Sequence, residues 1–124
     1  MQLTKQLLNE IADVTSKAAI ACYPYIGKKD KILADKAATD VMREYLNKLN
    51  IDGQVVIGEG ELDEAPMLYI GEKLGTGEGP SVDIAVDPLE GTNFAANNLP
   101  GALSVLAISA KGNLFNAPET YMDK

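Results

Sequence analysis

The chain has 124 residues, enough for one domain or for a piece of a larger one, and its 46% hydrophobic and 23% charged residues are typical of a folded globular protein. Its net charge of −7 argues against nucleic acid or an anionic membrane as a partner, because both attract basic patches. With no His and one Cys, the sequence excludes imidazole acid–base catalysis, Cys/His zinc sites and an intrachain disulfide.

A first helix is predicted from an apolar stripe with three- and four-residue spacing, from Leu7 to Cys22. Thr4 is placed to cap its start, and Pro24 and Gly27 should end it. Because Cys22 lies on the apolar face, we expect it to be buried, and a single cysteine fits the reducing conditions of the cytoplasm. The sequence shows no signal-peptide pattern and no 18-residue apolar run, so no membrane span is expected.

A second helix is predicted from the stripe at residues 34–49, and it stops at the sequence NIDG, residues 50–53. After that the period of the pattern changes. Strands are predicted at 54–57, 67–71, 81–87 and 102–109, with a glycine-rich connection at 71–80 and a turn at 110–113. Two helices followed by several strands indicate an α/β fold of the α+β type.

The stretch VDIAVDPLEGTNFA, residues 82–95, places three acids in a run that otherwise resembles a buried strand and holds no Lys or Arg. Unpaired buried carboxylates are costly, so such acids are normally paired or bound to a metal. We expect Asp83 to serve structure. Asp87 and Glu90, separated by Pro88-Leu89, can turn back on one Mg²⁺ or Mn²⁺, which binds carboxylates and substrate phosphate.

The residues that follow offer groups for a phosphate. Gly91 allows close approach of a ligand, Thr92 provides a hydroxyl, and their amides are predicted to open a short helix. Further acids lie where regular structure ends, at Asp35 and in residues 58–64, although each acid of that loop is an equally good candidate for a plain surface charge. Together these are the parts of metal-assisted phosphate-ester hydrolysis. Four other acids are interpreted as solvated surface charges: Asp13, Glu44, Glu72 and Glu78.

The motif DPLEGT, residues 87–92, resembles the metal-binding signature of the lithium-sensitive, metal-dependent sugar and inositol phosphatases, with Glu in place of the second Asp. Together with VVIGEGELDEAPMLYIGEKLGTG (55–77) and NAPETYM (116–122), it makes nearly the whole chain similar to the N-terminal part of class II fructose-1,6-bisphosphatases. The resemblance implies a layered α-β-α-β-α sandwich, of which residues 1–124 would be the metal-site half, with the second half absent.

The resemblance implies hydrolysis of the 1-phosphate of fructose 1,6-bisphosphate in gluconeogenesis, with sedoheptulose 1,7-bisphosphate as a further substrate of some members. The implied cofactor is Mn²⁺ or Mg²⁺, and its implied ligands are Asp35, Glu59, Asp87 and Glu90. The implied catalytic residues are Thr92, which would orient the attacking water, Asp63, which would activate it, and Glu59. The implied substrate contacts are Glu90, Gly91, Thr92, Tyr121 and Lys31.

Two other functions stay open. The chain can be a truncated product that binds metal or a partner without chemistry, or a related inositol or nucleotide monophosphatase. In the family, the second half supplies another metal-binding Glu and basic residues for the sugar phosphate. Because a sheet interrupted in mid-domain exposes edges and apolar faces, we expect a homo-oligomer or pairing with the missing C-terminal half.

Overall fold

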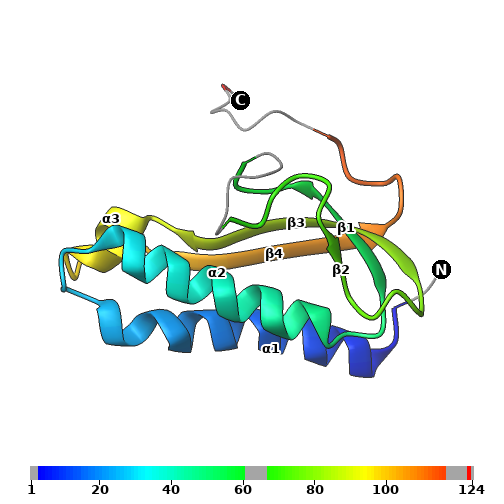
Figure 1. Ribbon diagram of the computed structural model, residues 1–124, viewed down its shortest axis with the longest axis horizontal. Coiled ribbons are helices and arrows are strands. Elements are labelled where there is room, and N and C mark those ends of the chain that lie inside the picture. The colour runs from blue at the N-terminus through cyan, green and yellow to red at the C-terminus, as the bar shows by residue number, and fades with distance from the viewer. Residues whose placement is uncertain (1–2, 61–66, 117–122, 124) are drawn as a thin grey trace.

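The structure is a computed structural model that describes residues 3–60, 67–116 and 123. Figure 1 shows a sheet with two long helices packed against one face. The α+β class predicted from the sequence is therefore confirmed. In chain order the elements are α1 (Lys5–Cys22), the 3-10 turn η1 (Tyr23–Tyr25), α2 (Lys31–Asn47), β1 (Asp52–Ile57), β2 (Lys73–Leu74), β3 (Ser81–Glu90), α3 (Thr92–Ala96) and β4 (Leu103–Ala110).

Both long helices begin at side-chain caps. The Thr4 hydroxyl accepts a hydrogen bond from the Leu7 amide at 3.1 Å, as predicted for the start of α1. The Asp30 carboxylate does the same for the Leu33 amide of α2, also at 3.1 Å. Such caps satisfy amides that have no partner within the helix and contribute about 1 kcal/mol each. At the other end of α1, Pro24 lies in η1, where the α-helix has stopped.

The four strands form one mixed sheet in the order β2-β1-β3-β4. Strands β1 and β3 are parallel, and the two outer pairings are antiparallel. Asp87 of β3 pairs with Val105 of β4, and Glu90 pairs with Leu103. An advance of three residues along β3 therefore corresponds to only two residues along β4. This bulge adds one residue to β3 just where the DPLEGT motif begins, and it turns the end of the strand.

One strand prediction is wrong. Residues 67–71 form a turn rather than a strand, and the short β2 lies instead within the predicted glycine-rich connection. The backbone of this segment is held by local bonds, because the Glu72 amide donates to the Tyr69 carbonyl at 3.0 Å and the Glu72 carboxylate accepts from the Tyr69 amide at 3.4 Å. Hydrogen bonds between a carboxylate and the backbone of its own loop compete with the backbone hydrogen bonds to a neighbouring strand that a β-strand would need.

The core lies between the sheet and the two helices. Alternation along β3 points Val82, Ile84 and Val86 at the helices, where they pack among buried residues of α1 and α2 such as Val14 and Met42. Each such side chain stabilises the fold by about 1.5–3 kcal/mol when fully buried. The opposite face of the sheet carries no helix in the described part of the chain (Figure 1). The further layers that the family resemblance implies remain a prediction.

Cys22 is 5% exposed at the end of α1, which confirms its predicted burial. Burial raises the pKa of its thiol, and the nearby Asp35 charge adds to the effect. No helix within the described ranges has the length and apolar character needed to span a membrane.

Candidate metal site

Three of the predicted ligands come from segments that meet at one edge of the sheet. Strands β1 and β3 are parallel neighbours, so their carboxyl ends share an edge. Ile57 pairs with Ala85, and Glu59 and Asp87 each follow two residues later. Asp35 comes from the second turn of α2, which packs against β3. The topology thus brings acids from α2, β1 and β3 to the same end of the sheet.

Asp35 and Glu59 interact directly. Burial raises the pKa of Asp35, and a hydrogen bond with Glu59 acts in the opposite direction. Within the described part of the chain, Oδ1 of Asp35 is buried and has no hydrogen-bond partner. Thr39, one helical turn after Asp35 and only 1% exposed, donates its hydroxyl to Oε2 of Glu59 at 3.5 Å. Two carboxylates close together favour either a shared proton or a bound cation, since like charges disfavour the ionised forms.

An oxygen-ligated divalent cation fits this pair of acids. The unpartnered Asp35 oxygen and the adjacent Glu59 carboxylate are hard donors of the kind that Mg²⁺ and Mn²⁺ prefer. Across residues 3–60 and 67–116, however, no three His, Cys, Asp or Glu side chains form a group that could hold a metal ion. The structure therefore brings together two of the four predicted ligands, and Asp87 and Glu90 lie at the neighbouring strand end.

The end of β3 carries the predicted phosphate-binding residues. Asp87 is half-buried before the bulge, and Glu90 is exposed as the last residue of the strand. Gly91 follows with φ +79°, a left-handed conformation that favours glycine, and a Cβ there would lie 2.9 Å from Cδ2 of Phe94. Thr92 is the first residue of α3, so the predicted short helix after the motif is confirmed.

The remaining predicted site residues are more dispersed. Lys31 is the exposed first residue of α2, four residues before Asp35. Residues at this spacing lie on the same side of a helix, so Lys31 and Asp35 share one side of α2. Asp63 and Tyr121 lie outside the described residues.

Asp83 has the structural role that the sequence predicts. Its side chain is 5% exposed on the sheet face away from the helices. The carboxylate accepts hydrogen bonds from the Gly112 amide at 2.7 Å and from the Leu114 amide at 3.4 Å. Asp83 therefore fastens the turn that follows β4 to the middle of the sheet.

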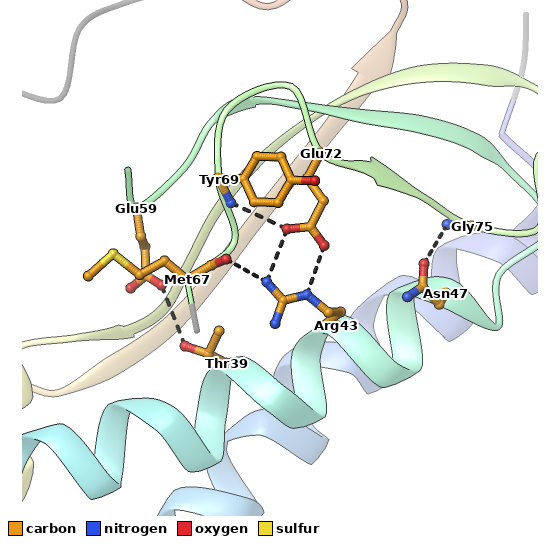
Figure 2. A network of polar contacts seen from close by, with 8 residues as sticks. All are labelled: Thr39, Arg43, Asn47, Glu59, Met67, Tyr69, Glu72 and Gly75. Atoms are coloured by element: carbon orange, nitrogen blue, oxygen red, sulfur yellow. Dashed lines mark hydrogen bonds and ion pairs between the residues drawn. The ribbon is translucent and has the colours of Figure 1, made fainter. Parts of the chain in front are cut away.

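The interpretation of Glu72 as a solvated surface charge is wrong, whereas the other three acids grouped with it, Asp13, Glu44 and Glu78, are exposed. Glu72 is 8% exposed and pairs with Arg43, whose Nε and Nη2 lie 2.8 and 3.0 Å from its two carboxylate oxygens. Figure 2 shows the same guanidinium reaching the carbonyl of Met67. Burial of this acid is tolerated because the bidentate pair neutralises it.

The sequence analysis missed Thr39 and Arg43. Both belong to a polar row on α2 with four-residue spacing, which starts at Asp35 and ends at Asn47, where Oδ1 accepts from the Gly75 amide at 3.2 Å (Figure 2). The signal was the i, i+4 spacing from Asp35, which places successive polar residues on one side of a helix. This row faces the chain segments on either side of residues 61–66.

A cavity of about 290 Å³ lies behind the end of β3, next to the DPLEGT motif. Pro88 and Leu89 form part of its wall together with Cys22, Ile26 and Leu99. Among the described residues that line it there is no Lys or Arg. The described wall therefore offers no cationic side chain to hold a sugar phosphate.

Comparisons with known proteins identify relatives over nearly the whole chain. Fructose-1,6-bisphosphatase 1 class 2 of Escherichia coli (strain K12) is 56% identical over 122 residues, which cover 98% of this chain and 36% of that protein. The D-fructose 1,6-bisphosphatase class 2/sedoheptulose 1,7-bisphosphatase of Synechococcus sp. (strain CC9902) is 53% identical over 122 residues, with the same coverage. The chain therefore spans about a third of the length of these relatives.

A solved structure shares the fold. The extragenic suppressor from Pyrococcus furiosus superposes with a TM-score of 0.58 at 20% sequence identity, over 87% of this chain and 42% of that one. At the sequence level, residues 5–124 match the family described as bacterial fructose-1,6-bisphosphatase, glpX-encoded. The chain belongs to this family.

Proposed function

We propose that this chain is the metal-site portion of a class II fructose-1,6-bisphosphatase, which hydrolyses the 1-phosphate of fructose 1,6-bisphosphate to fructose 6-phosphate and phosphate. Sedoheptulose 1,7-bisphosphate is proposed as a second substrate, since some relatives carry that activity in their names. The observation that carries the proposal is the Asp35–Glu59 pair, with its unpartnered buried oxygen, at the edge of the sheet where the DPLEGT motif ends.

The proposed cofactor is Mn²⁺ or Mg²⁺, held by Asp35 and Glu59 and completed by Asp87 and Glu90. When bound, such a cation stabilises negative charge on the phosphoryl group and favours ionisation of a water. Glu90 and Gly91 would contact the substrate, since the exposed strand end and the absence of a Cβ at Gly91 allow close approach. The Thr92 hydroxyl would orient the attacking water by a hydrogen bond.

Three further residues are assigned to this site on the family resemblance. Asp63 would accept a proton from the attacking water, Lys31 would attract the phosphate by its positive charge, and Tyr121 would reach a phosphate oxygen. By the same resemblance, the basic side chains that fix the sugar phosphate would lie in the remainder of the relatives, of which this chain covers 36%. We therefore propose that activity requires that part, in the same protein or in a paired fragment, within a cytoplasmic homo-oligomer.

The test joins residues 1–124 to the remaining two-thirds of the Escherichia coli relative, whose matching region is 56% identical. Phosphate release from fructose 1,6-bisphosphate is measured with Mn²⁺ and with EDTA, for this fusion and for the unjoined chain. We expect metal-dependent release by the fusion and none by the chain alone. A Glu90→Ala fusion should stay folded and lose the metal-dependent release, whereas an active Glu90→Ala fusion would show that the ligand assignment is wrong.

A substrate panel separates the proposed function from its relatives. Sedoheptulose 1,7-bisphosphate, an inositol monophosphate and a nucleoside monophosphate are compared with fructose 1,6-bisphosphate at equal concentration. Preference for a monophosphate would contradict the proposed substrate class. A folded fusion that binds Mn²⁺ but hydrolyses none of these compounds would favour a metal-binding protein without phosphatase chemistry.

A further inference from the structure

We propose that Arg43 is a positioning residue for the metal site, because it fixes the backbone that carries Glu59. The inference rests on the proposed function, in which Glu59 is a metal ligand. Arg43 lies two helical turns after Asp35 on α2. Its hydrogen bonds to the Met67 carbonyl and the Glu72 carboxylate tie it to the segment 67–72.

The guanidinium of Arg43 holds this segment at two points. Nη2 donates to the Met67 carbonyl and to Oε1 of Glu72, and Nε donates to Oε2 of the same carboxylate at 2.8 Å. Glu72 in turn accepts from the Tyr69 amide at 3.4 Å. A planar fork with fixed donors ties a carbonyl and a carboxylate to one rigid helix, which a flexible ammonium cannot do in the same way.

The held segment is bonded to the backbone of Glu59. The Glu59 amide donates to the Leu68 carbonyl at 2.9 Å, and the Ile70 amide donates to the Gly60 carbonyl at 2.9 Å. Leu68 itself is fully buried. Arg43 is hydrogen-bonded to Met67, and the next residue, Leu68, is hydrogen-bonded to Glu59. Figure 2 shows Glu59 and Met67 side by side above α2.

Thr39 holds the side chain of Glu59, whereas Arg43 acts on the backbone beside it. Its buried hydroxyl donates to Oε2 of Glu59 at 3.5 Å from the turn of α2 between Asp35 and Arg43. Helix α2 therefore presents three successive groups to this edge: the carboxylate of Asp35, the hydroxyl that orients Glu59, and the guanidinium that holds the backbone beside Glu59. Groups that orient ligands in this way typically change metal affinity by about 10–100-fold when removed.

The experiment replaces the buried pair by side chains of similar length, in the variant Arg43→Met/Glu72→Met. Removing both charges avoids an unpaired buried Glu72, so the fold should be retained. The matched control, Lys48→Met/Glu44→Met, removes an exposed ion pair from the same helix. Two quantities are measured on the 124-residue chain: Mn²⁺ affinity by calorimetry, and hydrogen exchange of the Glu59 and Ile70 amides in the metal-free chain.

We expect the Arg43→Met/Glu72→Met variant to bind Mn²⁺ about 10-fold more weakly and to exchange the Glu59 and Ile70 amides at least about 10-fold faster. The Asp52 amide, bonded to the Pro80 carbonyl at the opposite end of β1, should keep its exchange rate. Thr39→Val, which keeps the side-chain shape, should weaken Mn²⁺ binding without faster exchange at Ile70, and Thr39→Ser should restore it.

The two possible failures are distinguishable. Unchanged exchange at Glu59 and Ile70, or unchanged Mn²⁺ affinity in a folded double variant, would overturn the positioning role alone. An unsubstituted chain with no affinity for Mn²⁺ would overturn the proposed metal site, whatever the exchange rates. Equal losses of affinity in the Lys48→Met/Glu44→Met control would show that the effect belongs to the helix as a whole and would also overturn the positioning role.

Discussion

Two acids placed against the same sheet have opposite surroundings. Asp83, in the middle of β3, is 5% exposed and accepts hydrogen bonds from two amides of the turn after β4. Asp35, at the edge where β1 and β3 end, lies beside a second carboxylate and keeps one buried oxygen without a partner in the described part of the chain. Burial is thus not what distinguishes a structural acid from a candidate ligand.

The donors around a carboxylate indicate its role better than its burial does. Amide donors satisfy an ionised carboxylate without any ligand, as they do for Asp83, and a guanidinium does so for Glu72. The Asp35 carboxylate keeps a buried Oδ1 without a donor in the described part of the chain, and a cation supplies the missing compensation most simply. If this comparison is right, substitutions at the two places must separate metal binding from stability.

The largest effect is expected for Glu59→Gln, which keeps the side-chain shape but removes the charge. Mn²⁺ affinity of the chain should fall by more than about 100-fold, since loss of a direct ligand exceeds the effect of an orienting group. The midpoint of thermal unfolding without metal should change little. Calorimetric titration with Mn²⁺, together with a melting curve in EDTA, provides both values. Retained Mn²⁺ affinity would show that Glu59 is not a metal ligand.

Asp83→Ala should show the reverse pattern. The Gly112 amide loses a charged acceptor, which costs about 1.5–3 kcal/mol of unfolding free energy. Urea denaturation measures this loss, with Asp13→Ala at an exposed position as the control. Mn²⁺ affinity, titrated under conditions where the variant is folded, should equal that of the unsubstituted chain. A lower affinity with little loss of stability would instead make Asp83 a ligand.

Gly91→Ala tests the backbone that follows β3. Its φ of +79° and the 2.9 Å approach of a Cβ to the Phe94 ring predict a loss of about 1–2 kcal/mol. Gly112→Ala is a matched control, because it has a φ of +86° but nothing within 4 Å of the added Cβ. Equal losses of unfolding free energy in the two variants would assign the cost to conformation alone, and a larger loss at Gly91 would assign the remainder to the Phe94 contact.

The smallest change in stability is expected for Asp35→Asn, and it is a gain. Because burial raises the pKa of Asp35, its ionised form is the less favoured one in the fold, so ionisation lowers stability relative to the unfolded chain. Asp35→Asn avoids this cost, and its amide can donate to Glu59. Without metal at neutral pH the variant should gain up to about 1 kcal/mol, or about 4 °C in Tm, while losing Mn²⁺ affinity. A lower Tm in EDTA would show that the Asp35 carboxylate is compensated by donors.

Local patterns in the sequence were sufficient for the helices, the long strands and the buried Cys22. The Thr4 cap, the apolar stripes and the alternation of β3 all act between residues close in the chain, and each is found where it was predicted. The predicted strand at 67–71 was wrong because the apolar pattern does not show the side-chain bonds that hold this backbone. One is the bond of the Glu72 carboxylate to the Tyr69 amide, and another is the bond of the Met67 carbonyl to Arg43, more than twenty residues earlier.

The amino-acid sequence is enough to show which residues offer carboxylates and that the DPLEGT motif follows a buried strand. It is also enough to indicate the family, because the resemblance spans nearly the whole chain. Which of the acids already have hydrogen-bond donors depends on the tertiary structure. Asp83 and Glu72 meet their donors across 29 residues, and Asp35 meets Glu59 across the helix–sheet interface. Electrostatic compensation depends on distance in space, so chain order alone cannot assign it.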